Sequence, residues 1–298
     1  MNVIALPNGK PVYCGTYYSK AEWIEVLNKF NDLYNKDPKK MTDYANMVAK
    51  GVNEANIIEV NIQTNDFTTS DVSAIVNMEK ENWDLKWGGN KAPQKFILPA
   101  NLEVLLDYAV LSNDQATKDY LKLTLDKILL GGIYDHVGGG FFRYSTDPTW
   151  KVPHYEKMLY DNGQLLSLFS KAYRVFKNPA YKKIVFETYN FLEKEMKNPE
   201  GCYYSSIDAD SEGKEGIYYL WTEKELKTIL QNDFPLFAKY YTIAPNQKIE
   251  DNQFLFIKTK NDSAFAEHNN ISQSTLKEYQ VKWRQLLQKQ RATRTAVH

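Results

Sequence analysis

Apolar residues recur three and four positions apart through most of the chain, and this spacing places them on one face of a helix. Two such stripes are separated by a short polar break at 112–114, and two more lie on either side of 178–179. A last stripe covers 276–287. We therefore predict antiparallel helix pairs joined by tight turns from about residue 40 onward.

The first residues follow a different pattern. Two short β-prone runs, 2–6 and 12–18, flank a turn at 7–10 that contains an Asn-Gly pair, so we predict a β-hairpin. Ser19 then precedes an apolar stripe, with Glu22 three residues later, which indicates a helix that starts with a capping box. A hairpin and one helix are too small to form a domain alone.

The stretch 131–162 interrupts the helical pattern. It holds five glycines, three aspartates and two of the four histidines of the chain, together with an arginine and a tryptophan. Connections of this length usually carry function or are disordered. Its many aromatic side chains argue against disorder, so we predict an ordered, functional loop.

His154 is the residue of this loop that is best suited to acid–base catalysis. Pro153 is typical of the first turn of a helix, so we predict that His154 lies at a helix start, on the rim of a cavity. On that helix His154 and Asp161 would share one face about 10 Å apart, and Glu156 would share another with Tyr160. A neutral imidazole at a helix start is a suitable general base near pH 7. The alternative is that His154 only hydrogen-bonds a neighbouring loop.

Asp135 and His136 come directly before three consecutive glycines at 138–140, which allow a close approach of the backbone to a ligand or to another loop. The spacing matches neither a dinucleotide fingerprint nor a phosphate loop. A purely structural tight turn is equally consistent. Arg143 could bind a carboxylate or sugar hydroxyls, or pair with Asp135 or Asp147.

The segment 208–213 resembles the first half of a calcium-binding loop. Tyr219 stands at the twelfth position, where a bidentate glutamate is needed, so we expect no calcium site. The carboxylates Asp208, Asp210 and Glu212 are candidates for acid–base work or for binding hydroxyls. Turns stabilised by aspartate side chains are the alternative.

Together these motifs predict one site on the loops. The candidates for catalysis are His154, Glu156, Asp161, Asp208 and Asp210. The candidates for substrate binding are Asp135, His136, Arg143, Trp150, Tyr160, Asn162 and Glu212. We expect no metal ion and no organic cofactor.

Composition narrows the classes of partner. Lys plus Arg and Asp plus Glu each number 37, and a net charge of zero argues against binding to nucleic acid or to anionic membranes. No apolar run is long enough to span a membrane, and the N-terminus does not read as a secretory signal. Cys14 and Cys202 lie outside any C-x-x-C motif, so free thiols in a reducing cytoplasm are the simplest interpretation, with a disulfide left open. We expect a cytoplasmic protein whose partner is a small molecule.

Several long motifs resemble one family. The segments 131–166 (GGIYDHVGGGFFRYSTDPTWKVPHYEKMLYDNGQLL) and 201–222 (GCYYSSIDADSEGKEGIYYLWT), with LPNGKPVYCGTYY and GGNKAPQKF, resemble the thioredoxin-domain-containing family that includes spermatogenesis-associated protein 20. The resemblance covers nearly the whole chain. It implies a thioredoxin-like domain followed by an (α/α)6 toroid similar to N-acylglucosamine 2-epimerases and six-hairpin glycosidases.

Both ends depart from that family. The resemblance implies that 1–55 is the C-terminal half of a thioredoxin-like domain and that 56–298 is the N-terminal part of an incomplete toroid, a mainly α fold. The half of the thioredoxin fold with the redox cysteines is absent, so dithiol oxidoreductase activity is not expected of this chain. Unpaired helices of an incomplete ring would expose apolar surface, and we expect self-association.

Two functional hypotheses follow from the resemblance and the candidate residues. The first is a carbohydrate-active domain, either a sugar epimerase or isomerase with His154 as base, or a glycosidase with two carboxylates. The second is a toroid that binds a ligand or partner without turnover, attached to a thioredoxin-like domain.

Overall fold

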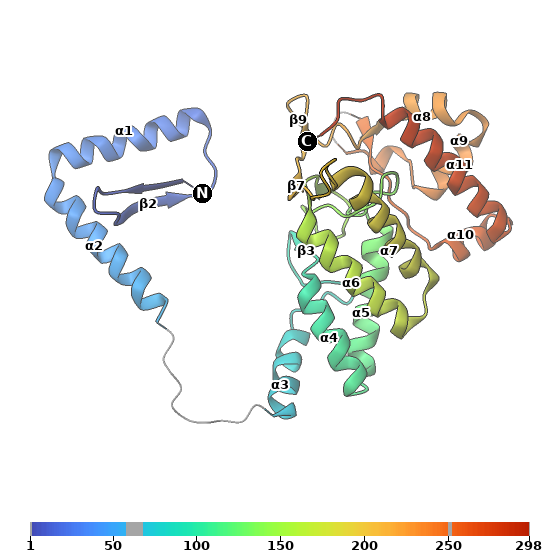
Figure 1. Cartoon of the computed structure of the whole chain (residues 1–298), viewed down its shortest axis with the longest axis horizontal. Helices are drawn as coiled ribbons and strands as arrows, with labels where there is room; N and C mark the ends of the chain where they lie inside the picture. The colour runs from blue at the N-terminus through green and yellow to red at the C-terminus, as the bar shows by residue number, and fades with distance from the viewer. Residues whose placement is uncertain (1, 58–67, 250–251, 298) are drawn as a thin grey trace. The chain divides into compact units, whose positions relative to one another are not determined.

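The computed structural model describes residues 2–57, 68–249 and 252–297, and the chain divides into two compact units, Met1–Thr68 and Thr69–His298 (Figure 1). The predicted fold class is confirmed, since the chain is mainly helical. In sequence order, a β-hairpin and a helix precede the paired helices. The predicted division, 1–55 and 56–298, falls at the end of the last helix described in the first unit. The assignment of the first part to a thioredoxin-like fold stays a prediction.

The first unit begins with the predicted hairpin. Strands β1 (Asn2–Ala5) and β2 (Pro11–Gly15) pair antiparallel. The predicted capping box at Ser19 and Glu22 is confirmed and begins α1 (Lys20–Lys36). Asp37 ends α1 and caps α2 (Pro38–Ala55), in which proline takes the first helical position.

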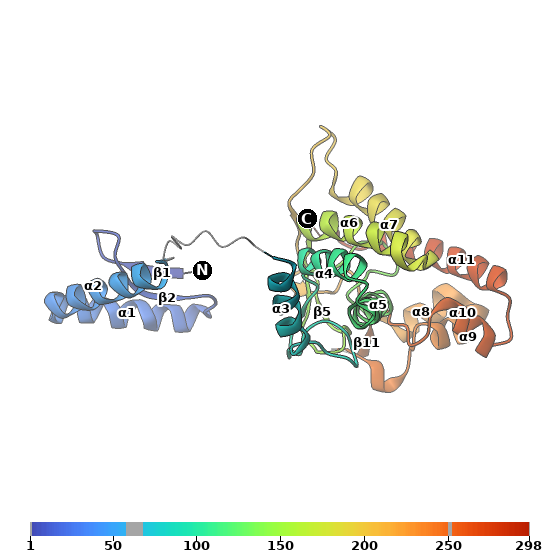
Figure 2. The ribbon, with the colours of Figure 1, turned by 90° about the horizontal axis from the view of Figure 1, so that it is seen from below.

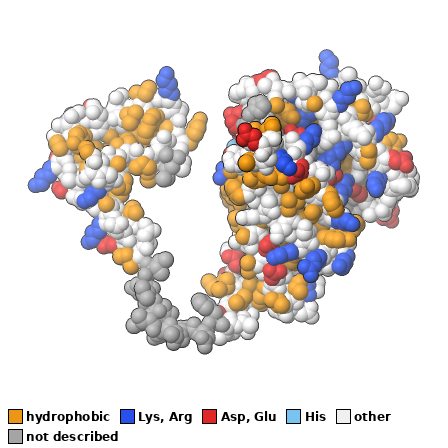
Figure 3. Space-filling model, in the orientation of Figure 1, with side chains coloured by type: hydrophobic (Ala, Val, Ile, Leu, Met, Phe, Trp, Pro, Cys, Tyr) orange, Lys and Arg blue, Asp and Glu red, His pale blue; other side chains and the backbone are white. Residues whose placement is uncertain are grey.

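The core of the first unit is small. Its buried residues are Leu6, Val12, Met41 and Ala45. No residue of α1 is buried, although the helix carries the predicted apolar stripe. Exposed apolar side chains of α1 and α2 contribute to the hydrophobic surface of this unit in Figure 3, and they include Ile24, Leu27, Leu33, Met47 and Val52.

The second unit is built of the predicted helix pairs. Helix α4 packs against α5 and α6, and α6 packs against α7. Figure 2 shows α4, α6, α7 and α11 along one side of the unit. Its helices are α3 (Thr69–Lys80), α4 (Pro99–Leu111), α5 (Gln115–Leu130), α6 (Leu159–Phe176), α7 (Pro179–Phe191), α8 (Glu223–Leu230), α9 (Phe234–Tyr240), α10 (Asp262–His268) and α11 (Gln273–Arg291).

Short helical turns extend this framework. A π-helical turn, Leu192–Met196, continues α7, and 3₁₀ turns lie at Gln231–Asp233 and Pro245–Gln247.

Two-residue strands fasten the loops to one another. Strands β3 (Lys95–Phe96), β4 (Tyr144–Ser145) and β5 (Pro153–His154) form one antiparallel sheet in that order. The other pairs are β6 (Lys157–Met158) with β7 (Ser206–Ile207), β8 (Asp210–Ser211) with β9 (Lys214–Glu215), and β10 (Trp221–Thr222) with β11 (Gln253–Phe254). Three of these sheets, β3–β4–β5, β6–β7 and β10–β11, join segments that are far apart in sequence.

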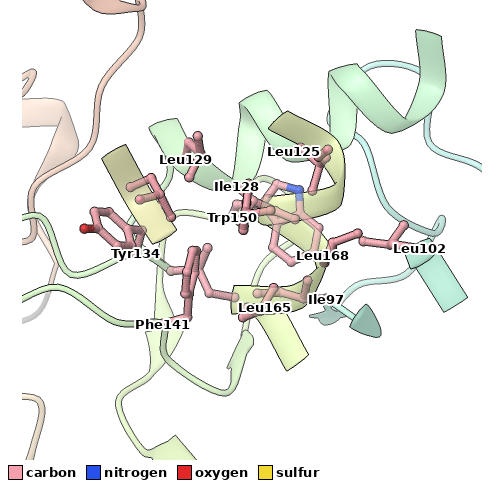
Figure 4. Packing of buried hydrophobic residues seen from close by; sticks show 14 of the residues in the cluster. Ile97, Leu102, Leu125, Ile128, Leu129, Tyr134, Phe141, Trp150, Leu165 and Leu168 are labelled. Carbon is pink, nitrogen blue, oxygen red and sulfur yellow. The ribbon is translucent and has the colours of Figure 1, made fainter. Parts of the chain in front are cut away.

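Trp150 anchors the loop 131–162 to the helices. It is fully buried, and Figure 4 shows it among Ile128, Leu165 and Leu168. Its indole Nε1 donates a hydrogen bond to the Trp87 carbonyl at 2.9 Å. The loop is therefore ordered by burial of its aromatic residues, as its composition predicts.

Candidate functional site

The loop 131–162 contributes one group of charged residues to the core. Asp135, Lys157 and Arg291 form what we call the buried triad: Oδ2 of Asp135 accepts from Lys157 Nζ at 2.8 Å and from Arg291 Nη1 at 2.7 Å. Its Oδ1 accepts the backbone N–H groups of Val137 and Gly138, both at 3.0 Å. Although burial alone would raise the pKa of Asp135, the two cations hold it well below its usual range.

Aromatic rings enclose Lys157, one of the two cations of this triad. Nζ of Lys157 lies 4.9, 4.4 and 5.0 Å from the ring centres of Phe142, Phe191 and Tyr219. It also donates to the Gly139 carbonyl at 2.9 Å. Asp135 is only 3% exposed, so it joins the loop to the last helix and does not face a ligand.

Three more candidates for substrate binding point inward. His136 Nε2 lies 3.0 Å from the Gly131 carbonyl, and burial lowers the pKa of this imidazole to about 3. Asn162 is fully buried and joins the Phe141 backbone to the first turn of α6. Trp150 belongs to the core described above. The structure gives these three side chains packing and bridging roles.

A second group of charged residues lies at the surface of the same loop. We call it the open cluster, and its members are Arg143, His154, Glu156, Asp161 and Glu215. His154 Nδ1 lies 2.7 Å from Glu215 Oε1, while its Nε2 is 3.6 Å from Glu156 Oε2. Since a carboxylate only accepts hydrogen bonds, Nδ1 carries the proton in the neutral ring and Nε2 presents its lone pair.

Arg143 holds Glu156 in place. Its Nη1 donates to Glu156 Oε2 at 2.9 Å, and its backbone N–H donates to the Glu156 carbonyl at 2.9 Å. Burial acts to lower the pKa of Arg143, but Tyr160 and Glu156 together raise it above its usual value. Its Nε is buried without a hydrogen-bond partner in the described part of the chain.

Asp161 is the second acidic group with an unusual environment. It lies in the first turn of α6, and its Oδ2 is buried without a hydrogen-bond partner among the described residues. Burial raises the pKa of Asp161 to about 6, although Arg143 acts in the opposite direction. A carboxyl group of this kind carries a proton through part of the neutral range and can act as an acid. Neighbouring Tyr160 is half-exposed.

The structure corrects the predicted setting of His154. The residue lies in strand β5, and α6 begins only at Leu159. His154 and Asp161 therefore do not share a helix face, and neither do Glu156 and Tyr160. Pro153 is compatible with the strand because such a short sheet leaves its nitrogen free of a ladder hydrogen bond. Glu215, not a helix dipole, sets the proton position on His154.

The acidic segment 208–213 supplies a hairpin in place of the predicted rim carboxylates. Asp208 Oδ1 accepts the Asp210 N–H at 3.3 Å, and Asp210 pairs with Glu215 across strands β8 and β9. Glu212 Oε1 accepts from the Thr295 hydroxyl at 2.5 Å. The acid of this hairpin that contacts His154 in the described structure is Glu215, on β9, and the prediction from sequence did not include it. The feature of the sequence that could have indicated Glu215 is the short strand–turn–strand pattern around the glycine at 213.

Other classes of site have little support in the described part of the chain. No group of three or more His, Cys, Asp or Glu side chains that could hold a metal ion is found there. Cys14 and Cys202 are both free and exposed. A search of the described helices finds none that is long and apolar enough to cross a membrane.

Comparison with known proteins identifies homologues in mammals and in a nematode. No family model matches the chain. It is 31% identical to human spermatogenesis-associated protein 20 over 251 residues, which covers 77% of this chain and 31% of that protein. The mouse protein of the same name is 30% identical over 249 residues, with the same coverage. An uncharacterized Caenorhabditis elegans protein is 25% identical over 335 residues, covering 100% of this chain and 45% of that one.

The chain thus spans about a third of the length of its mammalian relatives. The resemblance predicted from the motifs is confirmed for spermatogenesis-associated protein 20, and the thioredoxin-like part stays a prediction.

Solved structures align over about half of the chain. Cellobiose 2-epimerase from Bacillus thermoamylovorans aligns with a TM-score of 0.41 and 16% identity, covering 47% of this chain and 42% of that chain. A sugar epimerase from a ruminal bacterium gives 0.42 and 16%, covering 52% and 44%. A family 76 glycoside hydrolase gives 0.35 and 18%, covering 50% and 33%. Alignments at this level assign no activity.

Proposed function

We propose that the open cluster is an acid–base site that transfers protons on a sugar, as in an epimerase or isomerase. The observation that carries the proposal is the 2.7 Å contact between His154 Nδ1 and Glu215, while Nε2 lies 3.6 Å from Glu156 Oε2, beyond hydrogen-bond distance. A histidine oriented by a carboxylate on one nitrogen and open on the other is the usual form of a general base.

The reaction would use four groups of the cluster. His154 Nε2 takes the proton from the carbon beside a sugar carbonyl, so a C–H bond breaks and an N–H bond forms. The guanidinium of Arg143 stabilises the negative charge that develops on the carbonyl oxygen. Asp161, with its raised pKa, supplies a proton to the carbon on the opposite face, and Glu215 stabilises the imidazolium.

A glycosidase is the second candidate, and the Asp161 pKa of about 6 favours it. In that reaction Asp161 would protonate the leaving oxygen, and Glu156 would act as base or nucleophile. Sugar hydrolysis without proton exchange at carbon would support this version. Binding without turnover is the remaining alternative, and it is supported by the many candidate residues that serve packing.

The test is hydrogen exchange at carbon. The purified chain is incubated in D₂O with reducing sugars, and NMR follows deuterium at the carbon beside the carbonyl. We expect exchange by the wild type and by His268→Gln, an exposed control histidine, and a loss on the order of 10²- to 10⁴-fold in His154→Gln. Equal exchange by His154→Gln and the wild type would contradict the proposal.

A further inference from the structure

The sheet that carries His154 has two different faces. Phe96, Tyr144 and His154 are direct cross-strand neighbours on β3, β4 and β5, and they lie on the outer face. Their partners on the other face are buried, namely Lys95, Ser145 and Pro153. The alternation of a strand thus turns one side of the sheet toward the core and leaves a row of rings on the other.

These rings form a continuous stack. The ring centres of Phe96 and Tyr144 are 4.7 Å apart with an angle of 26° between the planes. The ring centres of Tyr144 and His154 are 5.1 Å apart with an angle of 28°. Phe96 lies on the edge strand of the sheet, and 48% of its surface is exposed. The ring of Tyr144 is stacked between Phe96 and His154, so the ring face of this row that is open to solvent belongs to Phe96. The other end of the row is the proposed base.

A single exposed phenylalanine needs no explanation. Phe96 is different, because stacking fixes the position of its ring before any ligand arrives. It is also exposed at a sheet edge, in a row that ends at the acid–base cluster. Binding to a preformed aromatic surface loses little conformational entropy. Sugar rings have one apolar face that packs on such a surface while their hydroxyl groups stay in water.

We propose that Phe96, held in place by Tyr144, forms a subsite for a second sugar ring, so the substrate is a neutral di- or oligosaccharide and not a monosaccharide. This proposal rests on the acid–base function proposed for His154. The ring that reacts lies at the open cluster, where charged groups can bind its hydroxyls and carbonyl. The next ring lies along the row, where the spacings of 5.1 and 4.7 Å extend the site to the sheet edge.

The chemistry of Phe96 also limits which sugars this subsite can distinguish. The phenyl ring of Phe96 has no hydrogen-bonding group, so it recognises a ring face and not a pattern of hydroxyls. The subsite should therefore accept several neutral sugars at this position and gain little from a phosphate or a carboxylate.

The experiment compares binding of one ring and of two. Kd is measured by NMR titration for glucose and for the disaccharides cellobiose and maltose, with wild type, Phe96→Ala and Phe186→Ala. Phe186 is a matched control, since its side chain on α7 is 57% exposed. We expect a disaccharide to bind about tenfold more tightly than glucose, which corresponds to about 1.4 kcal/mol. Phe96→Ala should remove this difference and leave glucose binding unchanged, whereas Phe186→Ala should change neither.

Equal binding of glucose and the disaccharides, no binding of any of them, or a difference that survives in Phe96→Ala would each overturn the subsite. Because the readout is binding, it separates the two proposals. A tenfold difference that depends on Phe96, without hydrogen exchange, would retain the subsite and reject the acid–base function. Hydrogen exchange on glucose, without tighter binding of the disaccharides, would retain the acid–base function and reject the subsite.

Discussion

The buried triad and the open cluster are two groups of charged residues that share the loop 131–162, yet they differ in how completely their atoms are paired. Both oxygens of Asp135 have partners. Arg291 has an unpaired Nε, but its guanidinium lies 5.3 Å from the ring centre of Tyr219. In the open cluster Asp161 Oδ2 and Arg143 Nε have no hydrogen-bond partner among the described residues, and His154 Nε2 is 3.6 Å from Glu156 Oε2, beyond hydrogen-bond distance.

This difference shows why charge alone is a poor guide to function. In the buried triad both carboxylate oxygens of Asp135 are already bonded within the fold, so neither is left without a partner for a ligand to satisfy. An incompletely paired group costs stability, and such a cost is typical of sites where binding or catalysis compensates for it. Asp135 was as good a candidate from sequence as Asp161, and pairing separates them.

The largest effect is expected from removing Lys157, one of the two cations of the buried triad. Lys157→Met should destabilise the second unit by about 3–5 kcal/mol, because Asp135 stays buried with one of its two cations gone. Thermal or urea unfolding measures the change. Lys227→Met is the control: this lysine forms an exposed pair with Glu223, and its loss should cost about 0–1 kcal/mol. Equal losses of stability in Lys157→Met and Lys227→Met would contradict the distinction between the buried triad and an exposed ion pair.

The next effect concerns the open cluster and should appear in turnover. Glu215→Gln should lower kcat on the order of 10²-fold with little change in KM, because Glu215 positions the imidazole and does not touch the substrate. Glu223→Gln is the control, since both glutamate side chains are 47% exposed. A fall in kcat of similar size in both variants, or a change confined to KM, would argue against a positioning role.

The smallest expected effect is a gain in stability at Asp161. The folded protein holds a proton on this carboxyl up to about pH 6, whereas the unfolded chain loses it near pH 4. The wild type therefore loses stability as the pH rises from 4 to 6. Asp161→Asn, which has no such proton, should match the wild type below pH 4 and exceed it by about 1 kcal/mol above pH 6, after allowance for solvent screening.

Melting curves of the two proteins at matched pH measure this gain. The buried neutral His136 makes both proteins less stable as the pH falls below about 6.5, and this contribution cancels in the difference between them. A constant difference from pH 4 to pH 8 would show that Asp161 does not titrate as described.

Elements with local signals were predictable from the sequence. The capping box at Ser19 and the helix pairs around the turn at 178–179 follow from spacing within one or two turns. His154 was expected at a helix start, but Pro153 is compatible with both a helix start and a strand, and the sheet partner Tyr144 decided for the strand.

Interactions between distant residues were not predictable. Glu215 lies 61 positions from His154, and Arg291 lies 156 positions from Asp135. No periodicity connects positions so far apart, so nothing local could separate Asp135 from Asp161 or select Glu215 among the acids of its hairpin. The sequence identified the loop, and tertiary contacts determined which of its side chains remain open.

The contact between Asp135 and Arg291 also bears on how the chain is made. A ribosome adds about 5–20 residues per second, so roughly 8–30 s pass between the synthesis of Asp135 and that of Arg291. During that interval Lys157 is the only cation of the triad that has been translated. The nascent chain therefore cannot complete its interior until α11 has emerged.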